Sequence, residues 1–491
     1  MFVFTYNRDK YRESGIDRRQ LETLITKHRS DAFPKLQKCM EYYEGRHAIE
    51  AKERTDGAPN NKTVCNHAKD ISDTASGYFM GSPITYDHDD KNLEKLLEAF
   101  DRAEVDDTDQ DNALSQSICG LAHDYTYIKE GESYLATVNL DSRHTFLVYD
   151  DTIEQNELFG VYYDVIRDDV DNTMRYEALV CDDENITRFI LYPSGNVDDR
   201  NLKALEITGD PTPHNLGYVP ITEYKNNKFG IGDFESQIGL IDAYNTLMAD
   251  RINDKEQFID SILVLYGAVL GDDDDETEKA QKQLKRRKLL EMPIDARAEY
   301  LSRTLDEASV ETLRRALKED IYTLSHVPNL TDEHFAGNSS GVAMEYKLLG
   351  LEMLTKVKER YYRKGLRKRI RMFCHFLGLK QIELDAGAIV PNFSRSLPRN
   401  VMEIAQIIGI LQGNVSQKTL IKLLPFVEDP DGEVEAVREE AAEKVKMQQE
   451  LFAEQEGTEN EPPEEMEEEP EEEEEEPKKK PKRPDIEMLN E

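Results

Sequence analysis

The chain has 491 residues and a net charge of −38, and this length is enough for about three domains, each with its own core. Its longest apolar runs, such as Ile262–Leu270 interrupted by Gly267, fall far short of the roughly 20 residues that a membrane span needs. The beginning of the chain also lacks the regions of a signal peptide, so we expect a cytoplasmic protein without a membrane segment.

Cysteine usage and charge exclude further classes. The five cysteines, Cys39, Cys65, Cys119, Cys181 and Cys374, are scattered and form no CxxC pair, which argues against a disulfide framework and a zinc site. Residues 454–491 carry a charge of −13, which leaves −25 on the rest. An acidic body disfavours a protein that grips duplex DNA, because phosphate binding uses Lys and Arg. A protein that must touch DNA without holding it is the exception.

The first half of the chain changes from helical to extended periodicity. Apolar residues at helical spacing predict helices over 17–43, 64–79, 93–99 and 110–122, with a short extended piece over 84–86. From Tyr125 the period is two, and segments rich in Val, Ile, Thr, Tyr and Phe predict antiparallel strands over 125–131, 132–140, 145–153, 159–167, 175–183 and 187–194. The glycines and Pro220 of the next stretch should break any regular element there.

The following segment predicts a module inserted between two helices. Helical spacing covers Phe234–Ile259 and Val310–Leu324. Between them lie a β-like run over 262–270, an acidic solvated turn over 271–276, a charged helix over 276–290 and an extended piece over 297–303. The order predicts a β-helix-β insertion.

The stretch from Gly341 to Leu377 predicts one long helix. Val342, Tyr346, Leu349, Met353, Val357 and Tyr361 recur at steps of three or four, and Leu366, Ile370, Phe373 and Leu377 resume the series. At the usual rise this helix is about 55 Å long. A polar loop containing Ser339 and Ser340 precedes it, and either serine can cap its first turn.

Beyond this helix we expect short extended pieces over 381–384 and 388–390. Three further helices are expected over 401–412, 419–424 and 433–452. From Glu454 the low-complexity acidic sequence should be disordered, because it cannot bury a core.

Motifs for chemistry are few, and each has a structural alternative. No GxxxxGK[ST], HExxH or GxSxG sequence occurs, so the phosphate cradle of an ATPase is missing. The Gly-rich fragment FGIGDF (229–234) is favoured as a structural turn, and the acidic run Asp272–Asp275 as a solvated turn rather than a divalent ion site. Asp332, Glu333 and His334 resemble an acid–base set, but a polar surface is favoured because they lack a partner nucleophile.

The long helix carries an unusual density of basic residues, namely Lys356, Lys358, Arg360, Arg363, Lys364, Arg367, Lys368, Arg369 and Arg371. They could form a nucleic-acid surface, but pairing with acidic neighbours is favoured in so acidic a protein. Lys285–Lys288 present the same choice.

Several stretches together resemble the portal, or head-to-tail connector, proteins of tailed double-stranded DNA bacteriophages, in the branch found in long-tailed phages of Gram-positive hosts. The matching pieces are NHAKDISDTASGYFMGSPITYD (66–87), HNLGYVPITEYKNN (214–227), GDFESQIGLIDAYNTLMADRINDKEQFIDSILVLYG (232–267) and FAGNSSGVAMEYKLLGLE (335–352). None of them is a catalytic signature.

The resemblance implies an elongated, mainly helical α+β subunit whose parts map onto this chain in order. They are a wing (1–233), a stem helix (234–260), a clip (261–305), a second stem helix (306–327), a tunnel loop (328–341), a long wing helix with short strands (342–398), a helical crown (399–453) and a disordered acidic tail (454–491). We hypothesise that the loop presents Asn329, Thr331, Asp332, His334, Asn338, Ser339 and Ser340 to passing DNA. The hypothesised clip contacts to terminase and connector are Asp272, Asp273, Asp274, Asp275, Lys285, Arg286 and Arg287.

The resemblance further implies a non-enzymatic ring, of twelve subunits in this family, at one vertex of the capsid. A separate terminase motor would package DNA through it, and head-completion proteins would dock onto it. The implied partners are the chain itself, terminase, major capsid and scaffolding proteins, connector proteins and transient double-stranded DNA, with no cofactor, metal or membrane. We expect assembly in the host cytoplasm and a final place in the virion. The alternatives are a scaffolding or adaptor protein and, less favoured, a packaging nuclease or terminase component.

Overall fold

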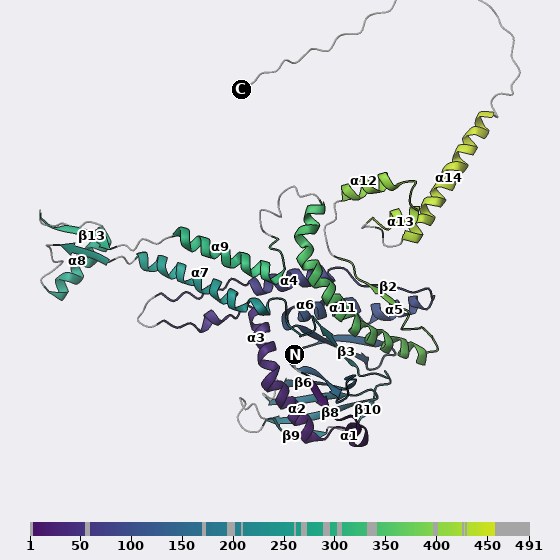
Figure 1. The fold of residues 1–491 in the computed structure, drawn as a ribbon, viewed down its shortest axis with the longest axis horizontal. Helices are drawn as coiled ribbons and strands as arrows, with labels where there is room; N and C mark the ends of the chain where they lie inside the picture. The colour runs from purple at the N-terminus through teal and green to yellow at the C-terminus, as the bar shows by residue number, and fades with distance from the viewer. Residues whose placement is uncertain are drawn as a thin grey trace, which may run out of the picture. The chain divides into compact units, whose positions relative to one another are not determined.

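The computed structural model describes residues 3–54, 59–168, 173–193, 202–207, 210–259, 262–266, 273–287, 295–301, 307–330, 341–395, 401–424, 427 and 430–456. The chain divides into two units, 1–398 and 399–491. Helices and strands both contribute to the first unit (Figure 1), so the predicted mainly helical α+β class is confirmed.

A large mixed sheet and two helices form the N-terminal part of the first unit. Within the described residues its strand order is β1-β5-β6-β7-β8-β10, with β9 also paired to β8. Leu21 and Ile25 of helix α2 are fully buried and pack with Phe146, Val148 and Phe159 of the sheet. The bounds are β1 Phe4–Tyr6, α1 Arg8–Ser14, α2 Arg18–Asp31, β5 Thr145–Asp150, β6 Glu157–Asp168, β7 Thr173–Cys181, β8 Asn185–Pro193, β9 Leu202–Ile207 and β10 Thr212–Pro213.

The predicted helix over 17–43 is in fact two helices. The first, α2, ends at Asp31, and the second, α3 (Phe33–Tyr43), has Pro34 in its first turn. Proline has no backbone N–H and clashes with the preceding turn inside a helix, but it is tolerated at a helix start. The apolar spacing therefore continued across a break that Pro34 imposes.

A helical layer and a smaller sheet form the middle of the first unit. The sheet has the order β11-β3-β4, and a two-stranded ladder joins β14 to β2. Its elements are η1 Ala48–Ala51, α4 His67–Met80, β2 Thr85–Asp87, α5 Leu93–Arg102, α6 Val105–Cys119, β3 Leu121–Ile128, β4 Leu135–Leu140, β11 Ile221–Lys225 and β14 Val390–Asn392. The six predicted strands are present, and residues 381–384 form no strand.

Two elements differ from the sequence prediction for backbone reasons. Helix α6 begins at Val105 and ends at Cys119, because Gly120 adopts the left-handed conformation with φ +79°. A Cβ at Gly120 would lie 2.4 Å from the carbonyl oxygen of Gly230, so only glycine fits. Strand β11 follows directly after Pro220, where no element was expected, because proline can stand just before a strand without removing a ladder hydrogen bond.

Helices α7 (Ile238–Ile259) and α9 (Glu307–Ser325) pack side by side, and α7 follows the short helix η2 (Glu235–Gln237). Between them the chain forms strand β12 (Ile262–Tyr266), helix α8 (Asp274–Arg287) and strand β13 (Arg297–Leu301). Figure 1 shows this insertion at the far end of the α7–α9 pair. The predicted β-helix-β insertion between two helices is confirmed.

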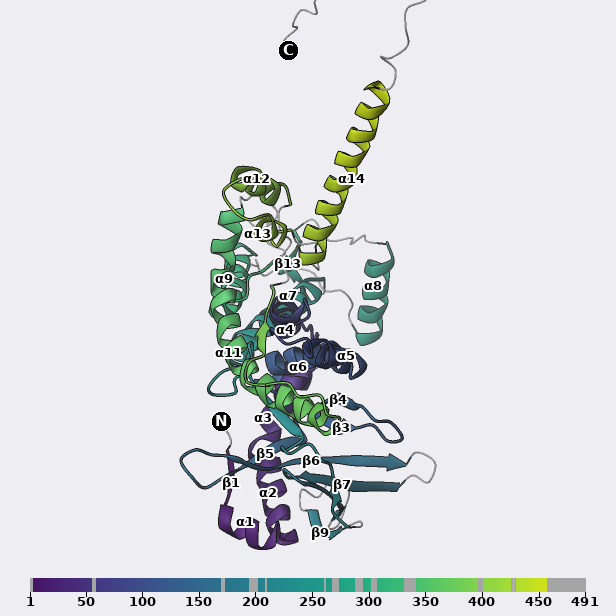
Figure 2. The same ribbon diagram turned by 90° about the vertical axis from the view of Figure 1, so that its right-hand side faces the viewer.

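Helix α11 (Gly341–Leu379) has 39 residues and takes part in two cores. Leu348 and Leu351 pack with α3, α4, α7 and α9. Leu366, Phe373 and Leu377 pack with α4 and α5. In Figure 2 the strands of the large sheet lie below these two helices. Each fully buried leucine or phenylalanine contributes about 1.5–3 kcal/mol, so α11 is held along most of its length.

The apolar stripe of α11 is not one continuous buried face. Tyr346, Leu349, Met353 and Val357 are exposed by 75%, 51%, 64% and 40%, whereas Leu366, Ile370, Phe373 and Leu377 are buried. The step from Tyr361 to Leu366 is five residues, which rotates the series onto another face at 3.6 residues per turn. The helix is therefore confirmed, but the single stripe is wrong.

The second unit contains α12 (Val401–Leu411), α13 (Gln417–Ile421) and α14 (Pro430–Glu456). Helix α13 begins at the cap Ser416, whose hydroxyl accepts a hydrogen bond from the Thr419 N–H at 3.3 Å. It packs against α14, and its Leu420 and Ile421 are buried. The disordered tail was expected from Glu454, but α14 continues to Glu456. The rest of the predicted tail, from 457 onward, lies outside the described residues.

Candidate functional site

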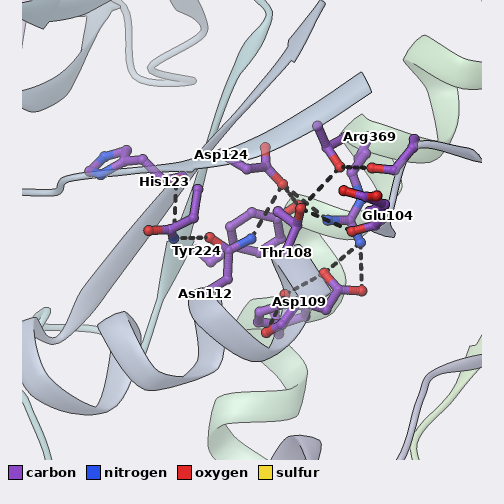
Figure 3. Close-up of polar contacts among 12 residues, drawn as sticks. Glu104, Thr108, Asp109, Asn112, His123, Asp124, Tyr224 and Arg369 are labelled. Atoms are coloured by element: carbon purple, nitrogen blue, oxygen red, sulfur yellow. Dashed lines mark hydrogen bonds and ion pairs between the residues drawn. The ribbon is translucent and has the colours of Figure 1, made fainter. Parts of the chain in front are cut away.

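A buried polar cluster anchors α11 to the smaller sheet and to α6 (Figure 3). The guanidinium of Arg369 is fully buried and donates to Asp109 at 2.6 and 2.8 Å and to Asp124 at 3.0 Å. The Tyr362 hydroxyl donates to Asp109 at 2.6 Å, and the Tyr224 hydroxyl donates to Asp124 at 2.7 Å. One cluster thus connects α6, β3, β11 and α11.

The cluster is sealed from solvent, and burial and neighbouring charges shift the pKa values of its members in opposite directions. Burial raises the pKa of Asp109, and the positive charge of Arg369 opposes that rise. Burial alone would lower the pKa of Arg369, but Asp109 and the other acidic groups raise it well above its ordinary value. Since Arg369 has no exposed surface, no dissolved substrate reaches its guanidinium. The network is a structural anchor.

The glycine in the middle of α11 allows this anchor to form. A Cβ at Gly365 would lie 2.5 Å from the ring of Tyr224. Tyr224 also stacks on Tyr362 with ring centroids 4.4 Å apart. Gly365 therefore lets β11 approach the helix closely, at a cost of roughly 1 kcal/mol in helix propensity.

A second buried ion pair joins α11 to the Gly-rich segment 229–234. The Lys358 ammonium pairs with the Asp233 carboxylate, and both side chains are only 3% exposed. Asp233 also accepts hydrogen bonds from Ser117 and Asn226. A Cβ at Gly232 would lie 2.4 Å from a backbone oxygen of α6. The prediction of a structural turn at FGIGDF is confirmed.

The basic residues of α11 divide into two groups. Lys358, Arg363, Lys368 and Arg369 pair with Asp233, Glu359, Glu157 and the Asp109–Asp124 carboxylates, and Lys356 lies 3.7 Å from Glu352. Arg360, Lys364, Arg367 and Arg371 are exposed and make no polar contact with another described residue. The favoured interpretation, pairing with acidic neighbours, holds for the first group only.

The helices on either side of the insertion are joined by ion pairs. Arg251 of α7 donates to Glu307 at 2.9 Å and to Glu311 at 3.1 Å on α9. Arg314 of α9 contacts the same Glu311 and donates to the Tyr244 hydroxyl at 3.2 Å. Hydrogen bonds from Arg314 and Arg251 lower the pKa of Glu311 to about 2. These contacts fix the side-by-side packing of α7 and α9.

The insertion itself is a two-stranded antiparallel ladder plus a helix. The register runs from Ile262 opposite Leu301 to Tyr266 opposite Arg297. The acidic run is not a solvated turn throughout, because Asp274 and Asp275 occupy the first turn of α8. The Asp273 carboxylate accepts a hydrogen bond from the Glu276 N–H at 2.8 Å. Carboxylates at a helix N-terminus are stabilised by the unpaired N–H groups there.

The remaining hypothesised contact residues are placed as follows. Lys285, Arg286 and Arg287 form the last turn of α8, and Asp272 lies outside the described residues. Asn329 lies just beyond α9. The other DNA-facing candidates, Thr331, Asp332, His334, Asn338, Ser339 and Ser340, fall in 331–340, outside the described residues.

A small hollow lies between helices α2 and α3 and the strands β5, β3 and β11. His28, His123, Lys35 and Glu223 are among its lining residues, and its volume is about 40 Å³. A hollow of this size holds water but no substrate. Burial lowers the pKa of His28 to about 3, assisted by the charges of His123 and His144. A histidine that stays neutral at pH 7 is a packing group here.

The described part of the chain shows no group of three His, Cys, Asp or Glu side chains that could hold a metal ion. Four of the five cysteines are buried, and Cys65 is partly exposed. Within that same part of the chain, no helix is both long enough and apolar enough to cross a bilayer.

The fold combines helices held together by buried ion pairs with a β-α-β insertion on a helical pair. Comparison with known proteins identifies the family. The family described as "Phage portal protein, SPP1 Gp6-like" matches residues 23–447. The chain belongs to this family of phage portal proteins, which are structural virion components rather than enzymes.

Two relatives carry the same description. The chain is 23% identical over 469 residues to the portal protein of Bacillus phage SPP1, covering 90% of each chain. It is 22% identical over 387 residues to the portal protein of Clostridium phage phiCD119, covering 75% of this chain and 82% of that one. A solved structure titled "Neck of native GTA particle computed with C12 symmetry" aligns with a TM-score of 0.43 at 10% identity, covering 73% of this chain and 89% of the other.

The sequence did not single out the partners of the anchor. Asp109 lies in helix α6, whose polar residues are buried on several sides. Asp124 is the third of three consecutive buried residues in β3 and stands one position before the predicted start of that strand. A carboxylate next to a predicted strand is a signal that could have indicated a buried cation partner.

Proposed function

We propose that the chain assembles as a closed ring that forms the DNA channel at one vertex of the capsid. A separate terminase motor packages DNA through the ring, the same channel later releases it, and head-completion and tail connector proteins dock onto the clip. The observation that carries this proposal is the order of elements α7, insertion, α9 and α11 in a chain of the portal family. We propose that α7 and α9 serve as the stem, the insertion as the clip and α11 as the wing helix. Assembly takes place in the host cytoplasm, with capsid and scaffolding proteins as partners.

The charge of the chain supports a conduit rather than a clamp. A net charge of −38 keeps DNA from binding strongly, because each neutralised phosphate would add an attraction that slows sliding. We propose that Asn329, Thr331, Asp332, His334, Asn338, Ser339 and Ser340 present short polar or acidic groups to the duplex. The ends of α8, with Asp273–Asp275 at one and Lys285–Arg287 at the other, are proposed as contacts for terminase and connector.

The ring is tested by native mass spectrometry and electron microscopy of the purified chain. We expect a closed ring, of twelve subunits by analogy with the family, that hydrolyses no ATP. A stable monomer in the presence of scaffolding protein would contradict the ring and favour an adaptor. ATP hydrolysis or DNA cleavage by the pure protein would contradict the non-enzymatic role.

The loop is tested by charge reversal. Asp332→Lys together with Glu333→Lys should leave the ring intact and reduce the amount of packaged DNA. Glu130→Lys with Glu132→Lys is the matched control, because both residues are exposed in the β3–β4 connection and the charge change is the same. Equal DNA filling in the two double variants would contradict the loop hypothesis.

A further inference from the structure

One face of α11 is exposed along about 38 Å and has two chemically different halves. The first half carries Tyr346, Leu349, Met353 and Val357, all at least 40% exposed. The second half continues at steps of three and four with Arg360, Lys364, Arg367 and Arg371, which are exposed as well. We call these eight side chains the α11 stripe.

The stripe is distinct from the face of α11 that builds the core. Leu348, Leu351, Thr355, Lys358 and Tyr362 are buried, and they lie between the stripe positions along the helix. None of the four cations of the stripe makes a polar contact with a described residue. The side chains of the stripe therefore remain exposed in the folded first unit and are not part of its core.

We propose that the α11 stripe is the surface through which one subunit contacts a second copy of this chain in the ring. The proposal rests on the proposed function, because a closed ring of identical subunits needs a heterologous contact between two different surfaces. A standard interface takes 20–30 residues on each side, so the stripe forms the centre of a larger contact.

The apolar half indicates a protein partner. Four large apolar side chains in one row are typical of an interaction site rather than of scattered surface residues. Phosphate groups of DNA would leave Tyr346, Leu349 and Met353 without a favourable contact. A surface that covers the whole stripe must be partly apolar and partly acidic.

The cationic half indicates that this partner is another copy. The chain carries −38 overall and −25 without residues 454–491, so identical subunits repel one another. Complementary charges at the contact are needed to offset that repulsion and to fix the register. Four unpaired cations against a neighbour rich in Asp and Glu supply this complementarity.

Two double variants test the two halves separately. Met353→Asp with Val357→Asp should weaken ring assembly at least about 30-fold, since central apolar contacts carry most of an interface's binding energy. Arg367→Glu with Arg371→Glu should weaken assembly as well, and the loss should be larger at low salt. Sedimentation velocity over a concentration series measures both effects, and thermal unfolding checks that the subunits remain folded.

The matched controls change equally exposed residues outside the stripe. Ile153→Asp changes a fully exposed isoleucine. Arg12→Glu with Arg18→Glu reverses the charge of two exposed arginines that have no described partner. These variants should assemble like the wild type. A photo-crosslinking amino acid at position 353 of the otherwise unchanged chain should link to a different surface of a neighbouring copy.

The outcomes separate this proposal from the proposed function. If the wild type forms rings and both stripe variants do so equally well, the proposal that the stripe is an interface is overturned and the portal function stands. If the charge variant forms normal rings but binds duplex DNA more weakly, the cationic half faces DNA and the proposal is overturned. If the wild type forms no ring even with scaffolding protein, both the proposed function and the stripe are overturned.

Discussion

Arg369 is a single cation shared by two carboxylates, Asp109 and Asp124, and all three side chains are buried. Removing one partner of a buried pair leaves the other charge without compensation. Arg369→Met keeps most of the side-chain volume but leaves both carboxylates buried without a cation. We expect it to lower the free energy of unfolding by about 3–5 kcal/mol in urea titrations.

The control for this prediction is an exposed arginine with no described partner. Arg12→Ala should change the free energy of unfolding by no more than about 0.5 kcal/mol. The triple variant Asp109→Asn, Asp124→Asn, Arg369→Met should recover part of the loss, because no unpaired charge remains. If Arg369→Met is as stable as the wild type, the cluster does not anchor α11.

His28 makes the stability of the N-terminal part depend on pH. Its folded pKa is about 3 because of burial and of the neighbouring charges of His123 and His144. The unfolded value is about 6.5, so the unfolded chain binds the proton first as pH falls. The stabilisation is complete above pH 6.5 and is lost progressively towards pH 3, with about 2 kcal/mol gone at pH 5.

His28→Gln isolates this contribution. Glutamine stays neutral and can still reach the Tyr163 hydroxyl, which lies 2.8 Å from Nδ1 of His28. We expect the loss of stability between pH 7 and pH 5 to shrink by about 2 kcal/mol. His375→Gln, at an exposed position of α11, should leave the pH dependence unchanged. An identical pH profile for both variants would contradict the prediction.

At the scale of elements, the acidic run at the start of helix α8 has two possible roles, as a helix cap or as a divalent ion site. Asp273 accepts from the N–H of Glu276, and losing such a cap costs about 1 kcal/mol. Asp273→Ala should therefore speed amide hydrogen exchange in α8 several-fold without affecting α7 or α9. Asp295→Ala, in the exposed turn before β13, is the control.

Adding divalent ions distinguishes the two roles of the acidic run in α8. If the acidic run binds Mg²⁺ or Ca²⁺ through its oxygens, either ion should slow exchange in the wild type and have no effect in Asp273→Ala. If capping alone is responsible, neither ion changes the exchange of α8 in either protein. The second result is the one that we expect.

The same elements show which parts of the fold are predictable from the sequence. The change of period from helical to alternating at Tyr125, and back at Phe234, predicted the strands and the insertion, because burial on one face imposes those periods. Backbone restrictions were harder to predict. Pro34 divided one apolar series into two helices, and β11 formed directly after Pro220.

The candidate site was predictable only in outline. The basic residues of α11 were recognisable in the sequence, but their partners are far away in the chain. Asp124 and Asp109 lie 245 and 260 positions from Arg369, and Asp233 lies 125 positions from Lys358. Spacing within one helix cannot tell which of its faces will find a partner. Lys358 and Arg360 differ by two positions, yet the first is buried in an ion pair and the second is exposed.

For the whole molecule, the net charge opposes the assembly that we propose. Removing residues 457–491 leaves α14 complete and changes the net charge from −38 to −27. Repulsion between identical subunits should fall with it, so the shortened chain should assemble at lower salt than the wild type. Light scattering at 50 and 500 mM NaCl measures the salt needed for ring formation.

A shorter truncation provides the matched control, because it removes tail residues but shifts the charge in the opposite direction. Residues 478–491 carry a net charge of +2, so their removal leaves −40. If mutual repulsion governs assembly, the salt requirement should rank this short truncation highest, the wild type next and the long truncation lowest. If the long truncation instead needs the most salt, the acidic tail makes attractive contacts, and its negative charge then favours the ring.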